Sequence, residues 1–210
     1  MSSAVVMLFA IVVLSACTKP QEVQPMALLT AKDLPVPTND SYVYCYGHGC
    51  HSRIVRRLTA QETAGLQGAF GKMASNAVDE RRSIGRAVAY MEKVNAPYAG
   101  TEQDVGGSFT GMFKSGQLDC VDEAINSTTT LLLLEEMGLL RYHSVYGQAN
   151  RGNLLAGWPH TSATVREKET GRLFVVDSWF GNNGDAPYIL DETVWAKGWD
   201  PARDPLPVDN

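Results

Sequence analysis

The segment from residue 119 to residue 138 constrains the fold most, because it predicts a long helix that is buried on all sides. Asp119 is a good N-cap, and acidic residues follow in the first turn of the predicted helix. Leu131 to Leu134 form a continuous apolar run, so no face of the helix is polar there. Gly138 is typical of a helix end. Such a helix is expected to run through the centre of the protein.

The residues before this helix predict one short strand and two further helices. The strand is expected within residues 41–52. Thr59 and Glu62 have the spacing of a capping box, which indicates the start of a helix. Apolar residues at helical spacing predict a second helix over residues 78–94, which Pro97 is expected to end.

The residues after the central helix predict strands. One is expected over 141–146, followed by a loop over 148–159. Two more are expected over 160–166 and 172–179, joined by the hairpin-like sequence 168–171. The sequence therefore predicts an α+β fold in which the central helix packs on an antiparallel sheet.

Composition excludes some classes of protein. Of the 210 residues, 44% are hydrophobic and 20% are charged, which is ordinary for a soluble globular chain. The formal net charge is −5 and there is no basic run of five or more residues, so nucleic-acid binding is not expected. The tail from residue 188 carries Trp195 and Trp199, which are expected to pack back on the folded region.

The N-terminus has the pattern of an export signal. Residues 4–14 are almost wholly apolar, about the length of a signal-peptide core and too short to span a bilayer. The sequence Leu14-Ser15-Ala16-Cys17 that follows resembles a lipobox, after which the new N-terminal cysteine is acylated with fatty acids such as palmitate. The alternative is an ordinary signal peptide with an incidental cysteine.

This pattern implies three regions. Residues 1–16 form a lipoprotein signal peptide, residues 17–40 a lipidated tether rich in Pro, Gln, Thr and Val, and residues 41–210 the folded domain. Thr18 rather than Asp follows the cysteine, which resembles the sorting pattern of outer-membrane lipoproteins. The expected partner is a lipid bilayer, and the expected location is the periplasmic side of the bacterial envelope, anchored by lipid.

Two of the three remaining cysteines are expected to form a disulfide. Cys45 and Cys50 enclose two glycines, and an oxidising compartment favours their pairing. With His48 and His51 they also suggest a metal site, and Cys45-x4-Cys50-His51 resembles a lengthened haem-attachment motif. The disulfide is the preferred interpretation, and neither a cofactor nor a metal is expected.

Cys120 is then left without a partner at the start of the central helix. The partial positive charge of a helix N-terminus favours the thiolate, which is the nucleophilic form. A thiol ionised well below pH 8.5 is therefore expected, and Cys120 is a candidate nucleophile. The alternative is a small apolar residue of the core.

His160 and Asp177 are the candidate partners of this thiol. Asp177 is flanked by apolar residues on a predicted interior strand, where an unpaired carboxylate is costly. A four-residue connection over 168–171 would place Asp177 opposite Ser162, so that His160 lies diagonally across on the same face. The alternatives are a surface histidine and a salt-bridged structural acid.

Cysteine at a helix start, histidine on a strand and aspartate on the next strand, in that chain order, resemble the transglutaminase-like cysteine hydrolase superfamily. The bacterial transglutaminase-like cysteine peptidases are the most similar branch, over residues 117–179. The resemblance implies a papain/transglutaminase-like core, with Cys120 as nucleophile, His160 as base and Asp177 as the residue that orients it. It also implies an oxyanion hole that includes the Cys120 N–H, to which Gln117 is a candidate second donor unless it is a plain loop residue.

The expected function is a thiol-dependent amide hydrolase or acyltransferase that acts through an acyl-enzyme on peptide or cell-envelope substrates. Two alternatives stay open. One is a papain-like cell-wall amidase, although such enzymes usually carry a second histidine where this chain has Asp177. The other is a non-catalytic envelope lipoprotein that uses the same fold for binding.

Overall fold

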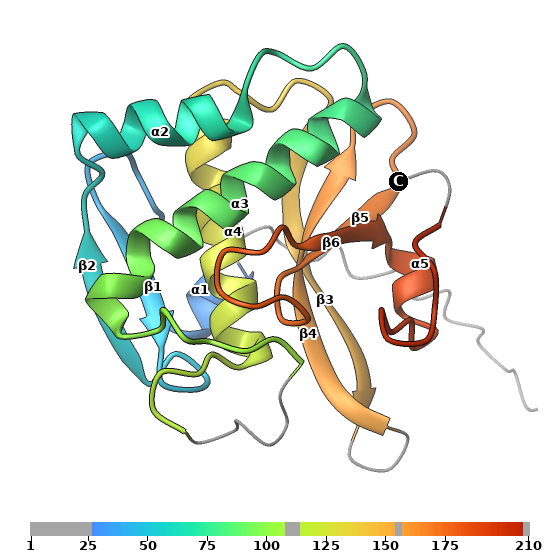
Figure 1. The fold of residues 1–210 in the computed structure, drawn as a ribbon. Helices are drawn as coiled ribbons and strands as arrows, with labels where there is room; N and C mark the ends of the chain where they lie inside the picture. Colours follow the sequence, from blue (N-terminus) through green and yellow to red (C-terminus); the bar gives the residue numbers. More distant parts are fainter. Residues whose placement is uncertain (1–26, 108–113, 154–156, 208–210) are drawn as a thin grey trace, which may run out of the picture.

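The computed structural model describes residues 27–107, 114–153 and 157–207, and within these ranges the chain forms an α+β fold of five helices and two antiparallel sheets (Figure 1). The elements in chain order are α1 (Ala27–Ala31), β1 (Tyr42–Tyr46), β2 (Ser52–Arg56), α2 (Ala60–Phe70), α3 (Ala77–Ala99), α4 (Cys120–Glu136), β3 (His143–Asn153), β4 (Gly157–Glu167), β5 (Leu173–Asp177), β6 (Tyr188–Asp191) and α5 (Glu192–Trp195). The predicted signal peptide over 1–16, the lipidation site Cys17 and residues 18–26 of the predicted tether lie outside the described residues.

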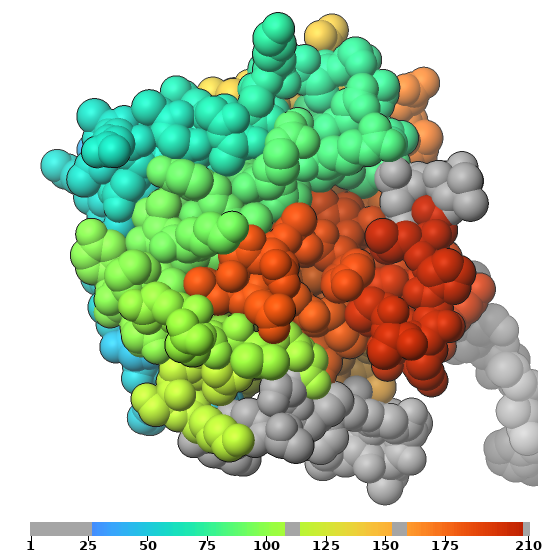
Figure 2. All heavy atoms as spheres, viewed as in Figure 1, coloured from blue at the N-terminus to red at the C-terminus, as the bar shows by residue number. Residues whose placement is uncertain are grey.

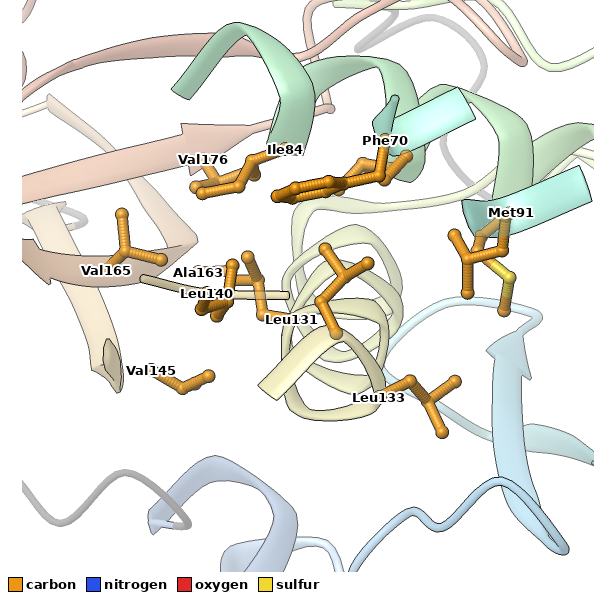
Figure 3. Close-up of a cluster of buried hydrophobic side chains, with 14 of the residues drawn as sticks. Phe70, Ile84, Met91, Leu131, Leu133, Leu140, Val145, Ala163, Val165 and Val176 are labelled. Atoms are coloured by element: carbon orange, nitrogen blue, oxygen red, sulfur yellow. The ribbon is translucent and has the colours of Figure 1, made fainter. Parts of the chain in front are cut away.

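Helix α4 lies at the centre of the protein, as the sequence predicts. Twelve of its residues are buried, including Leu131, Leu133 and Leu134. In Figure 3 the side chains of Leu131 and Leu133 lie between those of the sheet on one side and those of α2 and α3 on the other. Burial of this apolar surface stabilises the fold and leaves the first turn of α4 at the edge of the core.

The four-stranded sheet has the order β3-β4-β5-β6, with every neighbouring pair antiparallel. Its β4–β5 register pairs Ala163 with Val176 and Val165 with Phe174, and the N–H of Glu167 donates to Arg172 O over 2.9 Å. The predicted four-residue connection is thereby confirmed. The predicted loop over 148–159 is wrong, because β3 and β4 continue through most of it as a bulged ladder.

Helix α3 also differs from the prediction. It runs through Pro97 and ends at Gly100, which has a left-handed φ of 70° and whose N–H donates to Ala96 O over 2.8 Å. Proline lacks an N–H for the helix ladder and its ring crowds the carbonyl four residues earlier. Here it stands in the last turn, where buried Asn95 and Ala96 hold the helix in place. The capping box of α2, from Thr59 to Glu62, is confirmed.

The N-terminal hairpin was predicted only in part. The sequence indicated one strand within 41–52, whereas β1 and β2 pair as a hairpin whose connecting loop is closed by the Cys45–Cys50 disulfide. Residues 27–31, which fall within the predicted tether, form α1, and Leu28 and Leu29 of this helix are buried against the hairpin and α4. No helix in the described ranges is both long and apolar enough to cross a bilayer.

Glu80 of α3 joins that helix to the start of the sheet. Its carboxylate accepts hydrogen bonds from the backbone N–H groups of Arg141, Tyr142 and His143 and pairs with the His143 ring over 2.9 Å. These donors hold the pKa of Glu80 below its ordinary value, against the opposing effect of burial. His143 is thus a structural histidine, remote from the candidate site described next.

Candidate functional site

Cys120 is the first residue of α4 and the one free cysteine among the described residues. Asp119 is its N-cap, since its Oδ1 accepts hydrogen bonds from the N–H groups of Val121 (3.0 Å) and Asp122 (2.8 Å). Cys120 is partly exposed. It lines a pocket of about 350 Å³ together with residues from α1, β3 and β4, among them His160 and Thr161.

His160 and Asp177 are brought together as the strand alternation predicted. His160 Nε2 and Asp177 Oδ2 are 2.8 Å apart, and both side chains are buried. The imidazole ring packs among Trp179, Phe180 and Trp195, whose ring centroids lie 4.9 to 5.5 Å away. Its other nitrogen, Nδ1, is buried and has no hydrogen-bond partner among the described residues. The ring therefore has one nitrogen engaged by a carboxylate and one available for a proton.

Trp195 is a site residue that sequence reasoning did not identify. Its Nε1–H donates to Asp177 Oδ2 over 2.6 Å, so the same oxygen is bound by an indole and an imidazole. The tail was expected to pack back, and it does: Trp195 and Trp199 are buried, and Figure 2 shows the C-terminal residues (red) lying against the residues around β5 (orange). Nothing in the sequence, however, paired a tryptophan of the tail with an acid on β5.

Arg151 of β3 holds this tail against the site. Its guanidinium donates to the backbone oxygens of Trp195 and Trp199 and lies 4.3 Å from the Trp195 ring centroid. Arg151 also lines the pocket of Cys120, as does Lys32 on the side of α1. The pocket therefore has cations on two walls and an apolar contribution from Leu28, Val121 and Pro159.

The electrostatics of the thiol differ from the expectation. Burial raises the pKa of Cys120 to about 11; the Thr161 N–H lowers it in part, and the charges of Asp119 and Asp177 raise it further. The prediction of a thiol ionised well below pH 8.5 is therefore wrong for the resting site. The N-terminal charge of α4 does not outweigh desolvation and two nearby acids, which sequence reasoning did not count.

Gln117 does not have the geometry expected of an oxyanion donor. Its Nε2 donates to Gln103 O over 2.9 Å and to Gly116 O over 3.3 Å, and its Oε1 accepts from the Val105 N–H. Both amide hydrogens are used within the loop. Gln117 is accordingly a loop residue, the alternative that the sequence left open.

The disulfide between Cys45 and Cys50 is confirmed. Because both sulfurs are bonded to each other, neither thiol is available to attach haem or to ligate a metal. Over the described ranges, no group of three or more His, Cys, Asp and Glu side chains is arranged to hold a metal ion.

A cluster of buried acids lies behind the first turn of α4. Glu92, Asp104 and Glu123 are all buried, and one carboxylate oxygen of Glu92 and one of Glu123 lack a hydrogen-bond partner in the described part of the chain. Burial raises the pKa of Glu92 to about 8, although the Gly184 N–H, 2.8 Å from Oε2, opposes this. Burial likewise raises the pKa of Glu123 and of Asp104. Glu92 therefore favours the protonated form near neutral pH.

Comparison with models of known families, with curated proteins and with solved structures finds no match for this chain. A thiol and a carboxylate-bound imidazole line the same pocket, which is the set of groups that a covalent acyl-transfer mechanism needs.

We expect the Glu92→Gln variant to change how stability depends on pH. A buried carboxyl whose pKa is raised from about 4.5 to about 8 opposes folding once it ionises, so its effect is absent below pH 4.5 and complete above pH 8. Between these two pH values the unfolding free energy falls as the pH rises. In Glu92→Gln this fall should be smaller than in the parent chain by about 1.4 kcal/mol per pH unit. Urea unfolding at pH 5 and at pH 8 measures this.

The exposed Glu102 offers a matched control, since Glu102→Gln makes the same chemical change at the surface. If Glu92→Gln and Glu102→Gln shift stability equally at both pH values, Glu92 is ionised in the folded protein and its assignment as a protonated acid is wrong.

Proposed function

We propose that this protein is a thiol-dependent amide hydrolase or acyltransferase with Cys120 as nucleophile, acting on peptide or cell-envelope substrates. The observation that carries the proposal is the His160–Asp177 bond of 2.8 Å beside the pocket that His160 shares with Cys120. Cys120 lies at the start of α4, His160 on β4 and Asp177 on β5, in that chain order. This arrangement supports the resemblance to transglutaminase-like cysteine hydrolases and the proposal of a papain/transglutaminase-like core.

In this mechanism the Cys120 thiol is activated by transfer of its proton to His160, and it is not a thiolate in the resting site. His160 Nδ1 takes the Sγ proton of Cys120 as the sulfur attacks the substrate carbonyl carbon. The imidazolium, stabilised by Asp177, then gives that proton to the leaving amine as the C–N bond breaks. Water or a second amine attacks the thioester and regenerates the thiol. A thiol pKa of about 11 is compatible with this route, because the proton goes to a fixed acceptor inside the site.

Backbone N–H groups near the sulfur support charge stabilisation. The N–H groups of Thr161 and of Cys120 itself lower the pKa of the Cys120 thiol, so both stabilise negative charge at the sulfur. In the proposed mechanism the Cys120 N–H donates to the oxyanion that forms on the substrate. Two pocket residues, Lys32 and Arg151, are placed to contact the flanking parts of a substrate.

One observation favours the second candidate, a non-catalytic lipoprotein that binds its ligand in the same pocket. The raised pKa of Cys120 makes the thiol a weak nucleophile unless His160 accepts its proton. The two functions differ in what happens when His160 is removed, since a binding site does not need a base.

For the cellular location we propose lipid anchoring through Cys17 on the periplasmic side of the bacterial envelope, with the outer membrane as the membrane of attachment. The support is the apolar run over 4–14 and the lipobox-like sequence that ends at Cys17. In this proposal α1 follows the tether directly, and its residue Leu28 lines the pocket of Cys120.

The activity of site variants tests the enzymatic proposal. Cys120→Ser should abolish release of amine from peptide amides or cell-wall fragments, and His160→Ala should lower kcat by about 10²–10⁴-fold because the base is lost. Asp177→Asn should lower kcat as well, since it disturbs the imidazole that it orients. Rates of product release, with melting temperatures to verify folding, provide the measurement.

The exposed His51 supplies a histidine control, and His51→Ala should retain full activity. Turnover that persists in Cys120→Ser, or an equal loss in His160→Ala and His51→Ala, would contradict the assignment. Turnover of cell-wall fragments but of no peptide amide would favour the amidase alternative.

Metabolic labelling with palmitate tests the location. Cys17→Ser should lose the label, because the acyl chains need the new N-terminal cysteine, whereas Cys120→Ser should keep it. Equal labelling of the Cys17→Ser variant and the parent chain would show that Cys17 is not the site of acylation.

A further inference from the structure

The loop that joins β1 to β2 adopts an unusual run of left-handed conformations. Gly47, His48, Gly49 and Cys50 have φ values of 80°, 69°, 61° and 61°. Glycine adopts this region freely, but His48 and Cys50 do so only when surrounding contacts hold them there. A run of this kind turns successive backbone N–H groups toward one concave side, which is a binding site for anions.

The anions that fill this concavity are the two aspartates flanking Cys120. The N–H groups of His48 and Cys50 donate to Asp122 over 2.8 and 2.6 Å, one to each oxygen. The Gly49 N–H donates to Asp119 Oδ2 over 2.8 Å, while Oδ1 of the same carboxylate caps α4. The loop therefore binds the residue before the candidate nucleophile and the residue two positions after it.

These contacts are buried or partly buried and are connected to other elements. Asp122 is fully buried, and burial together with the neighbouring charge of Asp119 raises its pKa to about 7. Three N–H donors offset the cost of placing two carboxylates so close together. Asn126, one turn further along α4, accepts from the Cys45 N–H (2.8 Å) and donates to Cys45 O (2.9 Å). Lys32, which directly follows α1, donates to Gly49 O over 2.8 Å.

The disulfide closes this loop between its two anchoring points. It joins Cys45, held by Asn126, to Cys50, held by Asp122. Both cysteines are almost fully buried, at 0% and 2% exposed, so a reductant has no direct access to the sulfurs. A closed loop this short restricts the unfolded chain only modestly, and its principal effect is therefore on the folded site.

We propose that the disulfide-closed loop over residues 45–50 positions Cys120, with Asp119 and Asp122 as positioning residues through which it acts. By fixing the first turn of α4, the loop aligns the Cys120 thiol with His160 Nδ1. This inference rests on the proposed role of Cys120 as nucleophile and His160 as its base. An N-cap alone would stabilise the start of α4, but it would not fix the direction of this helix relative to β4.

Opening the loop without changing any charge tests the inference. Cys45→Ala/Cys50→Ala keeps Asp119 and Asp122 and adds no free thiol. The readout is the rate of Cys120 alkylation by iodoacetamide at pH 7 in the full chain, followed by mass spectrometry of the peptide that contains Cys120. We expect a fall of roughly 10-fold, because small misplacements of reacting groups lower rates steeply.

The decisive comparison repeats this change in a His160→Ala background. If the loop acts by aligning the thiol with His160, opening it should have little further effect once His160 is absent. An equal loss in both backgrounds, or no loss in either, would overturn the proposal and leave the loop a purely stabilising element. Alkylation needs no substrate, so a chain without hydrolytic activity would contradict the proposed function and still give a result for the loop.

Asp119→Asn is a second variant in case the double variant does not fold. Asparagine is as good a helix cap as aspartate. Its amide NH2 would, however, face the Gly49 N–H, so two hydrogen-bond donors would lie opposite each other. Loss of the Asp119 charge should lower the pH at which Cys120 becomes reactive. Loss of the alignment between Cys120 and His160 should instead reduce the His160-dependent rate of Cys120 alkylation at pH 7.

The control is Asp79→Asn, the same chemical change in the first turn of α3, where the side chain is partly exposed. Asp119→Asn is expected to lower kcat for hydrolysis with little change in KM. A His160-dependent alkylation rate that is the same in Asp119→Asn and Asp79→Asn would contradict a positioning role for Asp119.

Discussion

The buried carboxylate of Asp177 is the interaction on which the candidate site depends. It binds His160 of β4 and the indole of Trp195, which follows β6, so one oxygen joins the middle of the sheet to the C-terminal segment. A carboxylate at this depth is costly unless it is paired, and here two donors compensate for its burial. The same contacts leave one imidazole nitrogen, Nδ1, facing no other partner among the described residues. The orientation of the His160 ring thus follows from the need to satisfy a buried acid.

Local patterns predicted the parts of the fold that depend on neighbours in the chain. The cap at Asp119, the buried helix behind it and the register that places His160 beside Asp177 follow from capping, periodicity and alternation. Contacts between distant segments were not predictable in this way. The ladder over residues 148–153 and 157–159 has no clear alternation because it is bulged, and Pro97 is tolerated because buried neighbours hold its helical turn.

The pKa of Cys120 was also not predictable from local sequence patterns. A helix N-terminus suggested a low pKa for Cys120, yet burial and the charges of Asp119 and Asp177 raise it, and these depend on the packed structure. Burial likewise raises the pKa of Glu92 and of Glu123, which lies in the first turn of α4. The pKa of Cys120 is thus raised although Lys32 and Arg151 line the same pocket. In the proposed mechanism the thiol therefore depends on a correctly placed proton acceptor.

Nitrogen NMR of the His160 ring tests this account most directly, with the resonances assigned by comparison with His160→Gln. At a pH where the ring is neutral, the account predicts a proton on Nε2, which donates to Asp177, and none on Nδ1. The Nδ1 shift should then change in Cys120→Ser, because in the proposed mechanism that nitrogen takes the proton of the Cys120 thiol, which lines the same pocket. A proton found on Nδ1, or an Nδ1 shift that is the same in the parent chain and Cys120→Ser, would contradict the claim that His160 is the base for Cys120.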